Sequence, residues 1–157
     1  MFRAVRLDDE RLGMLWLHAM PGRLESWPRF VQEAEQARLS LVVCLTPRHE
    51  IAQLSPSYLE AIEHQALPFR WLHLPMRDLG LAPQFETFRA GVDEARDVLQ
   101  SQQNVLVHCA AGIGRTGTLA ACLLKRLRLP TPVALERVRE AGSSPESALQ
   151  GGLVEKF

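Results

Sequence analysis

Cys109 and Arg115 are the residues whose types and spacing point most directly to chemistry. They enclose the small residues AAGIG within the stretch HCAAGIGRTGT at positions 108–118. Such a loop can turn successive backbone N–H groups toward an anion, and an arginine at its end offers a planar fork that matches two phosphate oxygens. A cysteine beside this cradle is favoured as the nucleophilic thiolate. We therefore expect Cys109 to attack a bound phosphate group in line and to form a phosphocysteine.

We call residues 109–115 the cysteine loop. The helix predicted to begin near Arg115 adds the positive end of its dipole to the same place. The expected phosphate-binding groups are the backbone of the five intervening residues and one guanidinium: Ala110, Ala111, Gly112, Ile113, Gly114 and Arg115.

Two other phosphate-binding motifs overlap this loop. Gly112, Gly114 and Gly117 spell G-x-G-x-x-G, the dinucleotide fingerprint. That fingerprint also needs a later strand ending in an acidic residue about 20 positions on, but residues 130–141 read as a helix. The nucleotide P-loop needs a lysine after its second glycine, and Thr118 stands there instead. Both alternatives are therefore disfavoured.

The elements that must position the loop alternate along the chain. Apolar runs of strand length predict strands at 3–7, 12–20, 39–46, 69–76 and 104–108. Amphipathic or apolar helical patterns predict helices at 26–39, 55–67, 84–103, 115–129, 131–141 and 146–157, with Ser26 and Ser55 as N-caps. This alternation indicates an α/β fold with a mostly parallel sheet, and 157 residues suit a single domain, 1–157.

Composition limits the class of partner and the setting. The chain has 18 basic residues (Lys and Arg) and 18 acidic residues (Asp and Glu), so its net charge is about zero. This balance argues against a dedicated nucleic-acid or membrane-surface protein. Three cysteines without paired spacing suggest neither a disulfide framework nor a zinc site. The first residues lack an apolar signal segment, and no apolar run reaches the ~18 residues of a membrane span. We expect a cytoplasmic monomer that needs no metal and no cofactor.

The stretch VHCAAGIGRTGT (107–118) resembles the H-C-x-x-G-x-G-R-[ST]-G signature of the cysteine-dependent protein tyrosine and dual-specificity phosphatases. The resemblance implies that Cys109 is the nucleophile and that Arg115 binds the phosphate. It also implies that the Thr116 hydroxyl assists the departing sulfur when the phosphocysteine breaks down. His108 is expected to support the loop rather than to carry protons.

The stretch LPMRDLGLAP (74–83) is similar to the P-x-x-D-x-G-x-P loop of the same family, with Asp78, Gly80 and Pro83 at comparable places. The resemblance implies that Asp78 is the general acid, which protonates the leaving oxygen and then acts as base for water. The residues directly before and after this aspartate depart from the usual pattern.

The C-terminal residues 138–157 resemble a family segment that runs R-x-x-R-P-G, then a glutamine, then a phenylalanine. Gln150 falls at the glutamine that positions the hydrolytic water. Arg139 is the only arginine in these residues, so the second arginine of the pattern has no counterpart. The whole chain looks like the compact dual-specificity type, similar to kinase-associated phosphatase and small prokaryotic enzymes. This implies a sheet of four to five strands between helical layers of unequal thickness.

The substrate expected from these features is a phosphoprotein. Inositol-lipid phosphatases of the superfamily carry lysine inside the loop, whereas this chain has Ala110, Ala111 and Ile113. We therefore expect phosphotyrosine first, with phosphoserine or phosphothreonine second, and neither nucleic acid nor membrane as partner. The alternatives are a phosphopeptide-binding module without turnover, a small-molecule or inositol phosphate phosphatase, and a sulfur or arsenic enzyme.

Overall fold

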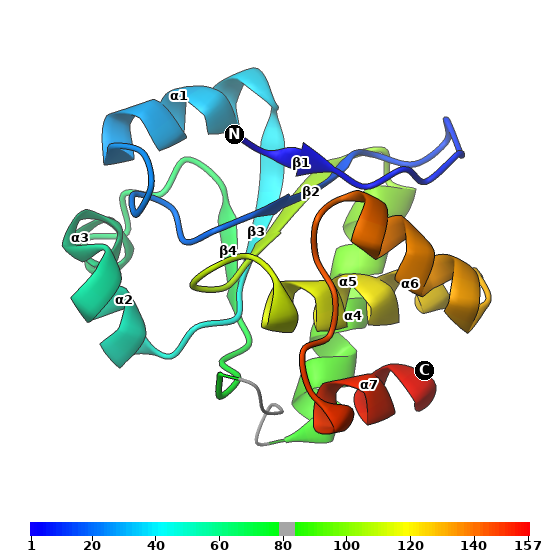
Figure 1. Cartoon of the computed structure of the whole chain (residues 1–157). Coiled ribbons are helices and arrows are strands. Elements are labelled where there is room, and N and C mark those ends of the chain that lie inside the picture. Colours follow the sequence, from blue (N-terminus) through cyan, green and yellow to red (C-terminus); the bar gives the residue numbers. More distant parts are fainter. Residues whose placement is uncertain (79–83) are drawn as a thin grey trace.

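The computed structural model describes residues 1–78 and 84–157 (Figure 1). Within them, five strands form one sheet in the order β1-β2-β5-β3-β4. Their bounds are β1 (Arg3–Ala4), β2 (Leu15–His18), β3 (Leu39–Cys44), β4 (Arg70–His73) and β5 (Asn104–His108). β1 pairs antiparallel with β2, and every other pairing is parallel. The predicted mostly parallel sheet is confirmed.

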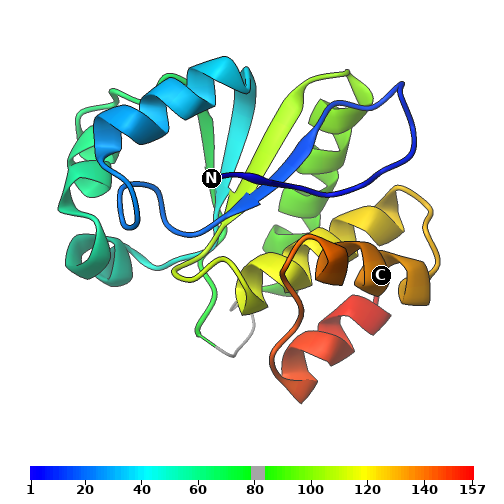
Figure 2. The ribbon, with the colours of Figure 1, turned by 45° about the horizontal axis from the view of Figure 1, so that its top comes forward.

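Helices cover both faces of the sheet, and one layer is thicker than the other, as expected (Figures 1 and 2). One layer holds α1 (Trp27–Gln36), α2 (Arg48–Leu54) and α3 (Pro56–Glu63). The other holds α4 (Phe85–Gln100), α5 (Gly114–Arg126), α6 (Thr131–Glu140) and α7 (Ala148–Glu155). No helix in the described ranges is long and apolar enough to cross a membrane.

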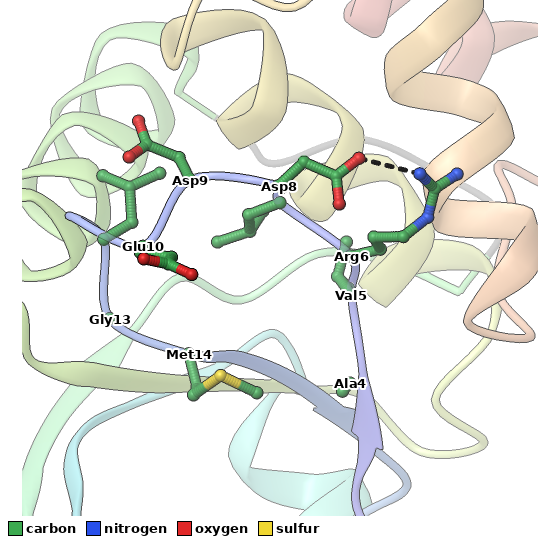
Figure 3. Close-up of a pocket in the computed structure, with 10 residues that line it drawn as sticks. Ala4, Val5, Arg6, Asp8, Asp9, Glu10, Gly13 and Met14 are labelled. Atoms are coloured by element: carbon green, nitrogen blue, oxygen red, sulfur yellow. Dashed lines mark hydrogen bonds and ion pairs between the residues drawn. The ribbon is translucent and has the colours of Figure 1, made fainter.

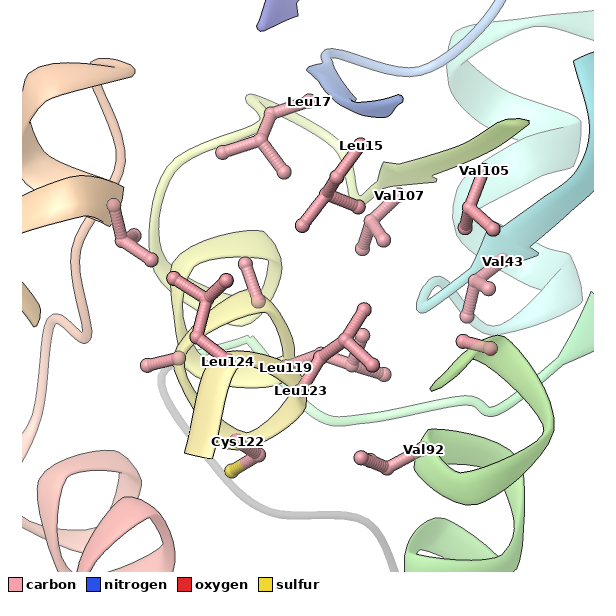
Figure 4. Packing of buried hydrophobic residues seen from close by; sticks show 14 of the residues in the cluster. Leu15, Leu17, Val43, Val92, Val105, Val107, Leu119, Cys122, Leu123 and Leu124 are labelled. Carbon is pink, nitrogen blue, oxygen red and sulfur yellow. The ribbon is translucent and has the colours of Figure 1, made fainter. Parts of the chain in front are cut away.

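The core explains why the strands read as continuous apolar runs. Alternate strand residues, among them Leu15, Val105 and Val107, pack with Leu119 and Leu123 of α5 (Figure 4). The residues between them turn to the other face, where Val42 and Leu106 pack with Phe30 of α1. Burial on both faces is typical of parallel sheets. β5 is thus fixed in the centre, and the residue that follows it, Cys109, lies at the carboxyl edge of the sheet.

The strands predicted at 3–7 and 12–20 are longer than the observed ones. After Val5 donates its N–H to Leu15 O at 2.9 Å, the chain leaves the sheet in a long loop. Gly13 approaches Gln103 so closely that a Cβ would lie 1.8 Å from its carbonyl oxygen, which is a packing contact outside the sheet. Beyond β2, Met20 donates its N–H to Ala110 O and so supports the cysteine loop instead of the sheet.

The helical predictions were right in place and wrong in some details. Ser26 caps α1 by accepting from the N–H of Arg29, as expected. Ser55 precedes α3, but its hydroxyl makes no capping bond and donates to Pro21 O at 2.7 Å. The helix α2 was not predicted, because only Ile51 of its seven residues is buried and no periodic apolar pattern results.

Candidate active site

Cys109 follows β5 directly, and its side chain is almost wholly buried. Its Sγ accepts hydrogen bonds from the Gly112 N–H at 3.2 Å and from the Thr116 hydroxyl at 3.0 Å. Two donors aimed at one sulfur suit a thiolate better than a thiol. The predicted pairing of Cys109 with Thr116 is therefore present in the geometry.

The carbonyl groups of the cysteine loop are bound by the surrounding chain. Ala110 O accepts from Met20 N at 3.2 Å and from Arg23 Nη1 at 2.8 Å. Ile113 O accepts from Gly117 N at 2.8 Å. Across the described part of the chain, no acceptor is present for the N–H groups of Ala110, Ala111 and Ile113. The loop therefore offers backbone donors to an anion.

Glycine is needed in this loop for close approach to neighbouring backbone. Gly112 has φ +76°, and a Cβ there would lie 2.5 Å from His18 O. Gly117 of α5 lies so near the loop before α7 that a Cβ would lie 2.5 Å from Ser144 N. The G-x-G-x-x-G spacing therefore reflects the tight turn of the loop and the packing of α5.

Arg115 lies in the first turn of α5, with 2% of its side chain exposed. Its Nη1 donates to Glu50 Oε2 at 2.6 Å and to Met76 O at 3.1 Å, and Nη2 donates to Glu50 Oε1 at 3.3 Å. Burial opposes the charged guanidinium, but the hydrogen bond to Glu50 and the charge of Cys109 raise the pKa of Arg115 overall. Its Nε is buried without a partner among the described residues, so a donor remains for a ligand.

Asp78 lies at the mouth of the same pocket. Its Oδ1 is 3.7 Å from Arg115 Nη2, and 74% of its side chain is exposed. The pocket measures ≈ 310 Å³, and its lining includes Cys109, Ala110, Ala111, Gly114, Arg115 and Asp78. The structure thus brings the expected nucleophile, cradle and acid together. Gly80 and Pro83 of the predicted acid loop lie outside the described residues.

His108 is buried behind the cysteine loop in a chain of hydrogen bonds. Trp71 Nε1 donates to the Tyr58 hydroxyl at 2.8 Å. The Cys109 carbonyl can only accept, so His108 Nδ1 carries the hydrogen and donates to Cys109 O at 3.1 Å. In the neutral ring Nε2 therefore accepts from the Tyr58 hydroxyl at 2.8 Å. Burial lowers the pKa of His108 to about 3. The ring is therefore neutral at physiological pH, in keeping with a supporting role.

Gln150 is fully buried on α7. Its Oε1 accepts from the Glu146 N–H at 2.9 Å, and Glu146 lines the pocket. The side chain is therefore buried beside the pocket wall. The sequence alone also allowed Gln150 to be a solvent-exposed helix residue, and its burial contradicts that alternative.

Three charged pocket residues escaped the sequence analysis: Arg23, Glu50 and Glu146. Arg23 and Glu146 come from loops, and Glu50 comes from the unpredicted helix α2. None belongs to a motif that the sequence displays. The available signal was that Glu50 follows a buried strand at the same sheet edge as Cys109.

A second hollow, of ≈ 740 Å³, lies inside the loop between β1 and β2 and is lined by residues 4–10 and 12–14 (Figure 3). Two of its three carboxylates are engaged: Asp8 pairs with Arg6 and Arg137, and Asp9 pairs with Arg11. It shares no lining residue with the pocket at Cys109. We therefore assign the candidate active site to the smaller pocket.

The fold and the cysteine loop define the class of cysteine-dependent tyrosine and dual-specificity phosphatases. A family model described as "Polymorphic toxin system, DSP-PTPase phosphatase" matches residues 21–127, more than half of the chain. The chain belongs to this family.

Individual relatives agree with this assignment. A protein of Invertebrate iridescent virus 3, named as tyrosine phosphatase 067L, is 33% identical over 110 residues, which are 68% of this chain and 42% of the viral protein. The chain therefore spans less than half of that relative. The solved structure of kinase associated phosphatase, with its catalytic cysteine replaced by serine, has TM-score 0.83 at 20% identity and covers 100% of this chain and 93% of its own. A mutant form of Tk-PTP has TM-score 0.73 at 26% identity and covers 98% of this chain and 93% of its own.

Proposed function

We propose that this chain hydrolyses phosphate monoesters on proteins, phosphotyrosine before phosphoserine and phosphothreonine, through a phosphocysteine at Cys109. One observation carries the proposal: the Cys109 sulfur accepts two hydrogen bonds beside a buried Arg115 whose Nε–H has no partner among the described residues. Membership of the DSP-PTPase family supports the same reaction.

In the first step, the Cys109 thiolate attacks phosphorus opposite the ester oxygen, so that the S–P bond forms as the P–O bond breaks. Asp78 gives its proton to the leaving oxygen, which departs as a neutral hydroxyl. The N–H groups of the cysteine loop and the Arg115 guanidinium stabilise the charge on the three remaining phosphate oxygens.

In the second step, water attacks phosphorus and the S–P bond breaks to release inorganic phosphate. The Asp78 carboxylate takes the proton of the water, so that the acid of the first step is restored. Thr116 Oγ1, 3.0 Å from the sulfur, donates a hydrogen bond to the departing thiolate and keeps its proton. We assign to Gln150 the placement of this water, because its partner Glu146 lines the pocket.

The charges around the pocket favour a singly phosphorylated group. Apart from Arg115, the lining contributes one cation, Arg23, and three carboxylates, Glu50, Asp78 and Glu146. Glu50 and Asp78 both lie beside Arg115, whereas Glu146 would repel a second phosphate. Leu54 adds an apolar surface to the wall that suits a phenyl ring better than a polyol.

The nucleophile is tested with phosphopeptides of one sequence that carry phosphotyrosine, phosphoserine or phosphothreonine. We expect the wild type to release phosphate fastest from phosphotyrosine, and Cys109→Ser to bind the peptide without turnover. Binding without hydrolysis by the wild type would favour the binding-module alternative. Turnover by Cys109→Ser within about tenfold of the wild type would overturn the assignment of the nucleophile.

The acid is tested by comparing phosphotyrosine with nitrophenyl phosphate, whose leaving group needs less protonation. We expect Asp78→Asn to slow phosphotyrosine hydrolysis by roughly 10²–10⁴-fold and nitrophenyl phosphate less. Asp97→Asn, on the exposed side of α4, is the matched control and should leave both rates unchanged. If Asp78→Asn has no effect while Glu86→Gln or Glu146→Gln loses phosphotyrosine activity, the acid lies on that other residue.

A further inference from the structure

Arg3 connects the N-terminal strand to the cysteine loop, 109 positions further along the chain. Its Nη2 donates to Gly112 O at 2.5 Å. Its Nη1 donates to Ala141 O at 2.8 Å and to Ser143 Oγ at 3.2 Å. The Ser143 hydroxyl in turn donates to Gly112 O at 2.6 Å. Two donors, one of them charged, therefore hold a single carbonyl of the loop.

The orientation of that carbonyl also determines the direction of a backbone N–H group, which points to the opposite side of the loop. Gly112 O and the Ile113 N–H belong to the same trans peptide group, and in a planar trans peptide these two groups point in opposite directions. When Arg3 and Ser143 hold Gly112 O on the outer side of the loop, the Ile113 N–H is turned inward. This N–H has no acceptor in the described residues, so it is available to a phosphate oxygen.

The Gly112 backbone would not keep this orientation by itself. Its φ of +76° belongs to a region that glycine enters and leaves without steric cost. The orientation of the preceding peptide group, between Ala111 and Gly112, is already fixed, because the Gly112 N–H donates to the Cys109 sulfur at 3.2 Å. Arg3 and Ser143 thus supply the constraint that the glycine lacks.

Arg3 also brings a positive charge near the nucleophile. Burial lowers the pKa of Arg3 overall, although interaction with the charge of Cys109 opposes this shift. Residues 138–157 contain one arginine, Arg139. The guanidinium that contacts Ala141 and Ser143 of this segment belongs instead to Arg3 of β1.

We propose that Arg3 is a positioning residue of the phosphatase site, which fixes the peptide group between Gly112 and Ile113 with its N–H facing the bound phosphate. The proposal rests on the proposed function for its catalytic consequence, but its geometric part concerns anion binding alone. A merely structural role, in which Arg3 only attaches β1 to the segment before α7, predicts altered stability with an unaltered site.

The test uses Arg3→Ala and Arg3→Lys, with Arg6→Ala as the matched control. Arg6 follows on the same N-terminal segment and carries the same charge, but it pairs with Asp8 and Glu140 at the surface. Three quantities are measured at a temperature where each variant is folded by circular dichroism. They are kcat and KM for nitrophenyl phosphate, the Kd for inorganic phosphate in a Cys109→Ser background, and the pH dependence of Cys109 alkylation by iodoacetamide.

We expect Arg3→Ala to weaken phosphate binding by about 10- to 100-fold, the usual effect of losing a charge-assisted hydrogen bond. Alkylation should also move to higher pH. Arg3→Lys keeps the charge without the bidentate reach, so its alkylation profile should stay near the wild type while its phosphate affinity falls. Arg6→Ala should leave all three quantities within about twofold.

Unchanged phosphate affinity and an unchanged alkylation profile in folded Arg3→Ala would overturn the proposal, whatever happened to stability. If Arg3→Ala does not fold, Arg3→Lys decides, since wild-type phosphate affinity in that variant also refutes the positioning role. If the wild type hydrolyses no phosphate ester and yet Arg3→Ala weakens phosphate binding, the proposed function fails and the inference about Arg3 stands.

Discussion

Replacing Tyr58 by phenylalanine removes one oxygen atom from the centre of the hydrogen-bond chain behind the cysteine loop. The hydroxyl is fully buried, and burial raises the pKa of Tyr58 well above its usual value, so it remains a donor at all physiological pH values. Its removal leaves His108 Nε2 without a donor and Trp71 Nε1 without an acceptor. The ring itself, stacked on Trp27, keeps its packing.

The expected loss of stability follows from these two orphaned groups. A buried polar atom left without a partner costs about 1–3 kcal/mol. His108 is completely buried and takes this cost in full, whereas Trp71 is only partly buried and recovers some of it through water. We therefore expect Tyr58→Phe to lower the free energy of unfolding by about 2–4 kcal/mol, a large fraction of the ~5–15 kcal/mol of a typical domain.

Urea unfolding followed by circular dichroism measures this difference, with equal m-values in the two proteins as the condition for comparison. The indole N–H resonance of Trp71 should shift in the same variant, because its acceptor is lost. A destabilisation below about 0.5 kcal/mol would show that the hydrogen-bond chain from Trp71 to His108 contributes little to stability.

Three further predictions concern the site itself. Thr116→Val should slow release of the thiolate, so that rapid-quench experiments find phosphocysteine at Cys109 accumulating while its formation changes less; equal slowing of both steps would contradict this role. Arg115→Lys should lose most affinity for inorganic phosphate by calorimetry, because an ammonium cannot replace the planar fork, and near-normal affinity would argue against the cradle. His108 has a pKa of about 3 when folded and an ordinary value of 6.5, so the unfolded chain binds more protons between these values. Its contribution to stability is therefore complete above pH 6.5 and declines by up to about 1.4 kcal/mol per pH unit as the pH falls toward 3, and an NMR titration midpoint of its ring above pH 5 would refute this.

The cysteine loop and the core strands could be predicted because their causes are local. The spacing of Cys109 and Arg115, the small residues between them and the apolar run of β5 all lie within residues 104–118. The N-cap at Ser26 is equally local, since the helix whose first N–H groups it satisfies follows directly.

The partners of the loop could not be predicted, because they are defined only by folding. Glu50 reaches Arg115 from 65 positions away, and it does so on a helix with too few buried residues to leave a pattern. Arg3 lies in a strand of two residues, and nothing in its neighbours distinguishes it from Arg6. Ser55 had the right position for a cap, but the carbonyl of Pro21 from a distant loop takes its hydroxyl instead.

The outward-facing carbonyls of the cysteine loop have a consequence for biosynthesis. Gly112 O is held from both ends of the chain, by Arg3 and by Ser143, and Ile113 O also accepts from the N–H of Ser144. A nascent chain that has emerged from the ribosome only as far as Arg115 contains the nucleophile and the arginine. Gly112 O then lacks the hydrogen bond from Ser143 and can accept only from Arg3. We therefore expect the loop to reach its anion-binding shape only after Ser143 and Ser144 have emerged and docked. On the proposed function, ribosome-bound intermediates shorter than this should be inert toward phosphate esters.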